Sequence, residues 1–280
     1  MTSRSMAERY DASAARYERW WAPVLAPTAI GLLDTADEAL APVEPTRILD
    51  LGAGTGTLTR AAVRRWPSAR VTALDASRGM LAAAEAIADS DLEDSQRARV
   101  DLVVAGADRM PLPDGSFDLV VSSFVLQLVP DRGRVLREIR RVLRPGGTLA
   151  FVTWLAGRRG ERWLPDDAFD DAVADVGIEE DEVDEESRSG DLPSVEAAVA
   201  QVRHAGFRDV RGRALTLAHD WNRESYLDFL ELYDEWDLFS GLSSGDRVRL
   251  RRAAQRRLGR LRPSDFAWRV PVVELTATRP

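Results

Sequence analysis

Residues 49–58, with the sequence LDLGAGTGTL, restrict the fold more than any other part of this chain. The short apolar run at 47–51 is typical of a buried strand, and glycines follow it at positions 52, 54 and 56. Glycines at such a turn let the backbone bend tightly and approach a ligand closely. The helix predicted at 57–66 begins with free N–H groups and the positive end of its dipole. The segment therefore predicts a strand, a ligand-binding loop and a helix.

The rest of the first half repeats this alternation of short apolar runs and helical stretches. Further strands are predicted at residues 71–75, 100–105, 117–123 and 148–154. Helices are predicted at 77–88, with Ser77 as N-cap, and at 131–143. Strands and helices that alternate at this spacing indicate βαβ units, and hence an α/β fold with a parallel sheet covered by helices on both faces.

The second half has a different pattern. Residues 157–193 are expected to form an acidic loop, with seven carboxylates between Glu179 and Glu186. A helix at 194–205, a strand at 210–217, helices at 223–239 and 245–261, and a last strand at 268–277 follow. We expect three regions within a single structural domain. They are an N-terminal helical cap (1–44), a ligand-binding core (45–156), and the remaining strands with inserted helices that cap the substrate (157–280).

The composition excludes several kinds of chemistry. The chain has no cysteine and two histidines, and all 38 of its basic residues are arginine. Disulfides, thiolate metal sites, a cysteine nucleophile, Schiff-base lysines and P-loop lysines are therefore excluded, and no metal centre is expected. The net charge of −8 disfavours nucleic acid and anionic membranes as partners. No signal sequence or membrane span is visible, so we expect a cytoplasmic protein.

Asp75 gives the glycine loop a more specific meaning. It lies 19 residues after Gly56, at the end of the second predicted strand. A carboxylate at that place can accept two hydrogen bonds from a ribose diol, so the loop and Asp75 predict a nucleoside site. A dinucleotide-binding loop has the spacing G-x-G-x-x-G, whereas Thr57 occupies its last glycine position here. The sequence therefore disfavours a nicotinamide-dependent oxidoreductase.

Three later blocks carry a resemblance to a known family. They are ADRMPLP at 107–113, DGSFD at 114–118 and EIRRVLRPGG at 138–147. Together with the loop at 49–58 they resemble class I S-adenosylmethionine (SAM)-dependent methyltransferases of the small-molecule type, and in particular the cofactor domain of ubiquinone/menaquinone-biosynthesis methyltransferases. The resemblance covers residues 47–154. It implies a Rossmann-like sheet of seven mostly parallel strands, an N-terminal helical cap, a helical insertion before the last strand, and SAM as cofactor.

The resemblance also implies roles for particular residues. The loop residues Gly52, Ala53 and Gly54 would contact the methionine part of SAM, with Asp50 holding the loop, and Asp75 would bind the ribose. The residues expected around the adenine are Ala76, Met80, Ala107, Asp108 and Arg109, and Ser123 is expected near the methionine amino group. The N-terminal segment with the pattern Y-D-x-x-A-x-x-Y is expected to place Tyr17 and Trp21 over the cofactor.

Methyl transfer from SAM is an in-line displacement, and much of the reactivity already resides in the cofactor. The protein chiefly has to align the acceptor and exclude water, so the sequence need not contain a catalytic residue. His219 is a weak candidate for a general base, because it follows a late strand near the expected acceptor. The alternative is a surface or capping histidine.

Tryptophan placement gives the best clue to the acceptor. The cap and the inserted segments contain Trp20, Trp21, Trp163, Trp221 and Trp236. We therefore expect methyl transfer to a small, apolar or aromatic molecule, on O, N or C, by a monomer or homodimer. Simple packing of the cap is the alternative reading of these tryptophans. The alternative function is a protein that binds SAM or S-adenosylhomocysteine (SAH) without turnover, as a sensor or partner subunit.

Overall fold

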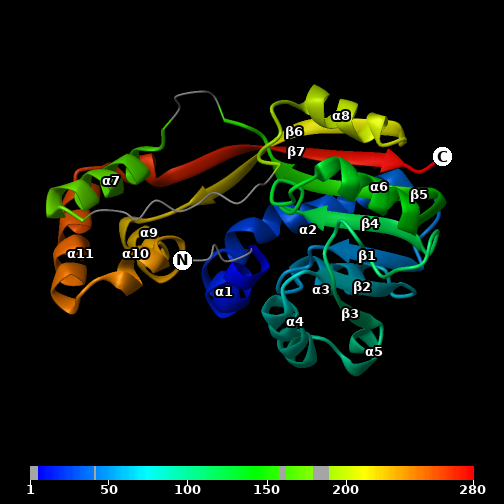
Figure 1. Ribbon diagram of the computed structural model, residues 1–280, viewed down its shortest axis with the longest axis horizontal. Coiled ribbons are helices and arrows are strands. Elements are labelled where there is room, and N and C mark those ends of the chain that lie inside the picture. Colours follow the sequence, from blue (N-terminus) through cyan, green and yellow to red (C-terminus); the bar gives the residue numbers. More distant parts are fainter. Residues whose placement is uncertain (1–5, 41, 158–161, 179–188) are drawn as a thin grey trace.

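The structure is a computed structural model that describes residues 6–40, 42–157, 162–178 and 189–280. Its centre is a seven-stranded sheet with the order β3-β2-β1-β4-β5-β7-β6 (Figure 1). The strands are β1 (Arg47–Leu51), β2 (Arg70–Asp75), β3 (Val100–Val104), β4 (Phe117–Ser123), β5 (Leu143–Trp154), β6 (Arg208–Asp220) and β7 (Ala267–Thr278). Strands β1 to β5 pair in parallel, and β7 is antiparallel to both β5 and β6. The predicted α/β fold with a mostly parallel sheet is confirmed.

Helices cover both faces of the sheet. One face packs against α2 (Ala22–Leu40) and α3 (Thr57–Arg65), and the other against α6 (Arg132–Val142) and α8 (Val195–His204). Successive residues of a strand point to opposite faces, so Ile48 of β1 belongs to the first buried cluster and Leu49 to the second. Leu49 is paired with Thr72 on β2 and Val120 on β4, which fixes β1 at the centre of the parallel part.

The N-terminal piece consists of α1 (Met6–Trp20) and α2. Helix α1 packs against α4 (Arg78–Asp91), which follows β2 and precedes the short α5 (Asp94–Arg97). Helix α2 buries Leu32, Leu33 and Ala36 against the sheet. Helix α1 is therefore a cap, whereas α2 is part of the helical layer that covers the sheet.

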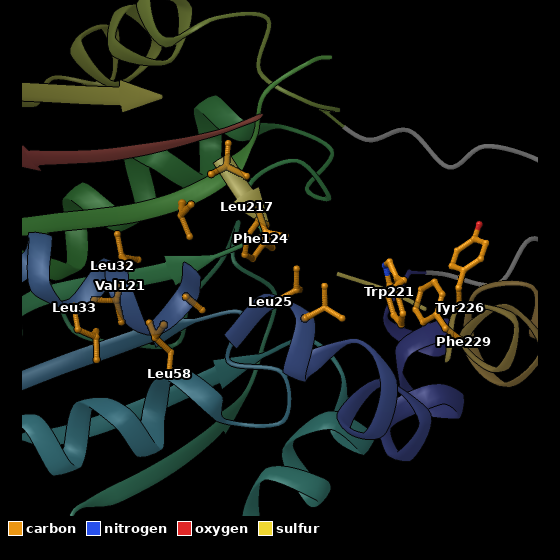
Figure 2. Close-up of a cluster of buried hydrophobic side chains, with 14 of the residues drawn as sticks. Leu25, Leu32, Leu33, Leu58, Val121, Phe124, Leu217, Trp221, Tyr226 and Phe229 are labelled. Atoms are coloured by element: carbon orange, nitrogen blue, oxygen red, sulfur yellow. The ribbon is translucent and has the colours of Figure 1, made fainter. Parts of the chain in front are cut away.

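Strands β6 and β7 extend beyond the parallel part of the sheet and lead to a group of helices, which we call the distal lobe (Figure 1). The lobe contains α7 (Leu164–Val176), α9 (Arg223–Phe229), the π-helix η1 (Leu230–Asp234), α10 (Trp236–Gly241), α11 (Ser244–Leu258) and the 3₁₀ helix η2 (Pro263–Phe266). One buried cluster includes residues of both the sheet layer and the lobe. Figure 2 shows part of it, from Leu32 and Leu33 on α2 to Trp221, Tyr226 and Phe229 in the lobe.

Two expectations for the second half are wrong. Residues 157–193 were expected to form a loop, but they contain α7, which buries Phe169, Ala172 and Val173 on one face. The single helix expected at 223–239 is divided into α9, η1 and α10, because a π-helical turn interrupts the α-helical hydrogen bonding. The acidic run from Glu179 to Glu186 lies outside the described residues. Among the described helices, none is long and apolar enough to cross a membrane.

Candidate active site

The carboxyl ends of β1 to β4 meet at one edge of the sheet, and the segments that follow them line a cavity of about 230 Å³. We call it the first cavity. Ligands of open α/β sheets bind at this edge. Nine of the residues predicted to bind the cofactor line it: Tyr17, Gly52, Gly54, Asp75, Ala76, Met80, Ala107, Asp108 and Ser123.

The glycine loop after β1 is held against β2 by hydrogen bonds to Asp75. Its Oδ2 atom accepts a hydrogen bond from Gly54 N at 2.8 Å, and its Oδ1 atom accepts one from Ser77 N at 2.8 Å. Burial raises the pKa of the Asp75 carboxyl. At Gly52 φ is +71°, and a Cβ atom there would lie 2.2 Å from Val125 Cγ2. Position 52 therefore requires glycine, as the loop motif predicts.

Asp50, Ala53 and Arg109 do not line the first cavity. Asp50 lies fully buried next to the loop, where it accepts a hydrogen bond from Thr59 Oγ1 at 2.6 Å. Burial raises the pKa of this carboxyl to about 7. The negative charge of Asp75 contributes to this rise. A positively charged ligand in the cavity would favour the ionised form of Asp50.

The charges around the first cavity fit a cationic nucleoside. Asp75 and Asp108 are the acidic residues of its described lining, which contains no arginine or histidine. Asp108 follows β3, is half exposed, and forms an ion pair with Arg134 at 3.6 Å. Carboxylates can accept hydrogen bonds from a ribose diol or an amino group, and Ala76 and Met80 add apolar surface beside them. This combination suits the nucleoside part of SAM.

Helix α1 covers the first cavity with Tyr10 and Tyr17. It is tied down by Asp11, whose Oδ1 atom accepts hydrogen bonds from Ser77 Oγ at 2.5 Å and from Gly79 N at 2.7 Å. These bonds lower the pKa of the Asp11 carboxyl. Tyr10 and Asp11 belong to the Y-D-x-x-A-x-x-Y segment, but the sequence did not indicate that Asp11 binds the first turn of α4.

A second cavity of about 540 Å³ adjoins the first. Both cavities are lined by Tyr10, Tyr17, Phe124 and Leu128, which therefore form a shared wall. The aromatic residues that line the second cavity are Tyr10, Tyr17, Trp21, Phe124, Trp154 and Trp268. Trp21 lies between α1 and α2. It lines the second cavity but not the first, although it was expected beside the cofactor.

Most of the tryptophans selected from the sequence lie elsewhere. Trp20, Trp163, Trp221 and Trp236 line neither cavity. Trp163 packs edge-on against Tyr226, and Trp221 is buried in the lobe. Trp154 and Trp268 take their place, and both belong to strands, where the sequence suggested only sheet core. His219 also lines neither cavity; its ring lies 4.3 Å from that of Trp221, so the structure gives it no position for acting as a base.

Phe124 is the most constrained residue of the shared wall. Its φ of 57° is unusual for an aromatic residue and marks a strained position directly after β4. Phe124 N donates to Val152 O at 2.8 Å, and its carbonyl accepts from Gln127 Nε2 at 2.7 Å. Thr153 Oγ1 donates to the other end of the Gln127 amide. These buried bonds hold Phe124 where the two cavities meet.

Comparisons with known proteins agree with this site. The family model described as "Methyltransferase domain" matches residues 49–151. A malonyl-(acyl-carrier protein) O-methyltransferase of Halorhodospira halophila is 32% identical to the chain, over 98% of this chain and 84% of the relative. A ubiquinone/menaquinone biosynthesis C-methyltransferase of Methylobacterium nodulans is 36% identical over 51% of this chain and 54% of its own length.

The fold is also found in solved structures. A Haemonchus contortus phosphoethanolamine N-methyltransferase in complex with SAH superimposes with a TM-score of 0.57 and 20% identity. The match covers 96% of this chain and 58% of that one. The chain belongs to the class I SAM-dependent methyltransferases, and SAM is its cofactor.

Proposed function

We propose that the first cavity binds SAM and that the second cavity binds a small, apolar or aromatic methyl acceptor. The observation that carries this proposal is the shared wall. It brings the second cavity, which we also call the chamber, next to a first cavity suited to a cationic nucleoside. A volume of about 540 Å³ is in the range of pockets for small molecules. An acceptor in the chamber would meet the cofactor at Tyr10, Tyr17, Phe124 and Leu128.

When SAM is bound, its sulfonium supplies an activated methyl group, so the protein contributes mainly alignment and the exclusion of water. The glycine loop and Asp75 bind and orient the nucleoside, and Asp108 accepts hydrogen bonds at the far side of the first cavity. Asp50 balances the positive charge from beneath the loop. Tyr10 and Tyr17 keep water from the junction, while Phe124 fixes the line along which the acceptor approaches.

A second candidate is suggested by the relative from Halorhodospira halophila, which is named for a malonyl group on an acyl-carrier protein and matches 98% of this chain. An acceptor that ends in a carboxylate is best held by a cationic group. The described lining of the second cavity contains no arginine or histidine, and the chain has no lysine. The cavity therefore favours a small, uncharged or cationic acceptor over malonyl carriers.

Production of SAH tests the proposal directly. The purified protein would be incubated with SAM and a panel of phenols, hydroquinones, indoles and aryl amines, with malonyl-acyl-carrier protein as the competing candidate. We expect turnover with aromatic members, and we expect Trp154→Ala to raise the KM for the acceptor more than tenfold while the Kd for SAM stays within about twofold. Turnover with the malonyl carrier alone would contradict the proposal. Binding of SAM without turnover of any acceptor would favour a sensor.

A further inference from the structure

The second cavity contains one charged residue among its described lining, and it is an acid. This residue, Asp191, lies in the segment 189–194, which precedes α8. The other lining residues are aromatic, aliphatic or glycine, apart from the Gln127 amide. That amide is already occupied by the Phe124 carbonyl and the Thr153 hydroxyl. Asp191 is therefore the charged group that the described lining offers to a ligand.

Backbone hydrogen bonds on both sides fix the position of Asp191. Gly190 N donates to Gln127 O at 2.9 Å, and Leu192 N donates to Trp154 O at 3.1 Å. The segment is thus attached to two other walls of the same cavity. These bonds fix the backbone on both sides of Asp191, which is exposed where it lines the cavity.

The carboxylate of Asp191 makes no hydrogen bond or ion pair with any residue in the described ranges. Among the described residues, Arg132 attracts it electrostatically. Arg132 is 6% exposed, and its guanidinium is held by other groups. Its Nε donates to Leu126 O at 2.9 Å, its Nη1 donates to Gln201 Oε1 at 3.2 Å, and its Nη2 donates to Gly190 O. Arg132 therefore stiffens the segment without neutralising Asp191 by direct contact.

Asp191 belongs to the part of the second cavity that the first cavity does not share. Tyr10, Tyr17, Phe124 and Leu128 line both cavities, whereas Gly157, Gly190 and Asp191 line the second alone. A ligand in the second cavity can therefore contact both the shared wall and Asp191. The same cavity is lined by Trp21, Trp154 and Trp268, with ring centroids 5.6 Å apart for Trp21 and Trp268 and 6.0 Å apart for Trp154 and Trp268.

We propose that the acceptor is an aromatic compound that carries a basic amine at a position other than the methyl-accepting atom. This rests on the proposed function and specifies its substrate class. The ammonium group pairs with Asp191, and the tryptophans add attraction for a cation as well as apolar contact. A carboxylate in the same place faces Asp191 and finds no described cationic lining group, so anionic analogues are rejected.

Three phenols that differ mainly in their end group provide the test. Tyramine carries an amine, tyrosol carries a hydroxyl, and 3-(4-hydroxyphenyl)propanoate carries a carboxylate. Each would be titrated by calorimetry into the full-length protein saturated with SAH. We expect tyramine to bind about tenfold more tightly than tyrosol, and the propanoate to bind more weakly than tyrosol.

The variant Asp191→Asn is expected to weaken tyramine binding about tenfold and to change tyrosol binding less than twofold. Its affinity for SAH and its Tm should match those of the wild type, because Asp191 is exposed and does not line the first cavity. Asp237→Asn, at an exposed carboxylate on α10 that lines neither cavity, is the matched control and should change neither titration.

Equal affinities for tyramine and the propanoate, absence of tyramine binding, or an unchanged tyramine affinity in Asp191→Asn would each overturn the inference. Failure of the proposed function would look different. It would appear as a lack of SAH production with every small aromatic acceptor, whereas the titrations measure binding and depend on no turnover.

Discussion

Asp50 is a buried carboxyl whose pKa of about 7 makes cofactor binding sensitive to pH. In the ligand-free protein it takes up a proton as the pH falls through 7, whereas a cationic ligand favours its ionised form. Binding of SAM should therefore release protons near pH 7, and affinity should fall as the pH is lowered from 8 to 6. Calorimetry in buffers of different ionisation enthalpy measures both effects. Asp50→Asn should bind SAM about tenfold more weakly at pH 8 and show a flat profile between pH 6 and 8.

Ionisation of Asp50 favours SAM binding but lowers the stability of the ligand-free protein. Its folded pKa lies above the ordinary value of 3.8, so the folded state favours the protonated form. Ionised Asp50 destabilises the fold above pH 7, and this penalty decreases as the pH falls toward 3.8. Asn at position 50 can still accept the bond from Thr59. We expect Asp50→Asn to raise Tm at pH 8 and to lose most of this gain at pH 5, and an equal gain at both values would contradict this account.

Two glycines provide a matched pair of substitutions. Gly52→Ala places a Cβ 2.2 Å from Val125 at a φ of +71°, so we expect the loop to be distorted and SAM affinity to fall at least a hundredfold. Gly31→Ala lies within α2 and meets no atom within 4 Å. It should raise the free energy of unfolding by about 0.5–1 kcal/mol. Calorimetric titration with SAM and chemical denaturation check the two outcomes, and equal behaviour of the pair would count against the role given to Gly52.

At the scale of elements, Asp11 joins helix α1 to the first turn of α4 beside the first cavity. A charged acceptor of two hydrogen bonds contributes on the order of 1–3 kcal/mol. Asp11→Ala should release α1 and increase the dissociation rate of SAH about tenfold, with little change in Tm, because one surface helix opens locally. Ser13→Ala is the control, since its hydroxyl bonds only to the backbone of its own helix. Stopped-flow displacement measures the dissociation rate of SAH from both variants. Equal rates for Asp11→Ala and Ser13→Ala would show that Asp11 does not hold α1 over the first cavity.

The strands of the first half were predictable because each contains a short apolar run, and β1, β2 and β4 end at or directly before glycine, aspartate or serine. The start of α4 was predictable too, since Ser77 accepts the capping bond from Met80 N. Helix α7 was missed because aspartates dominate its sequence, although its buried face is present at Phe169, Ala172 and Val173. The π-helical turn in η1 depends on packing between elements, and no local pattern announces it.

The two cavities differ in how far the sequence determines them. The first is formed by segments that directly follow consecutive parallel strands, so order along the chain was enough to predict most of its lining. The second is formed by Trp21, Trp154 and Trp268, which come from the N-terminal piece and from two antiparallel strands. Their proximity depends on the pairing of β5 with β7 and on the way α2 crosses the sheet. Neither property can be derived from residue spacing.

At the scale of the whole molecule, the buried cluster that includes α2 also includes Trp221, Tyr226 and Phe229 in the distal lobe. Contacts between Trp21, Phe229 and Trp268 add a direct link between the N-terminal piece and the lobe. A lobe that shares its core with the sheet has no separate hydrophobic interior to keep it folded alone. We therefore infer that sheet and lobe unfold together, as one cooperative unit.

Trp221→Ala tests this coupling, because it removes a large side chain from the lobe's part of the cluster. Loss of a buried tryptophan costs about 3–5 kcal/mol. If the core is continuous, the Tm of the whole protein falls and calorimetry still records one transition. Far-ultraviolet circular dichroism should then show a transition at the same temperature. Leu232→Ala, at a side chain 37% exposed in the same lobe, should cost less than about 1 kcal/mol. Two separated transitions in Trp221→Ala would instead indicate a lobe that folds by itself. The second cavity, whose Trp21 packs against Phe229 of the lobe, would then lose this contact whenever the lobe unfolds.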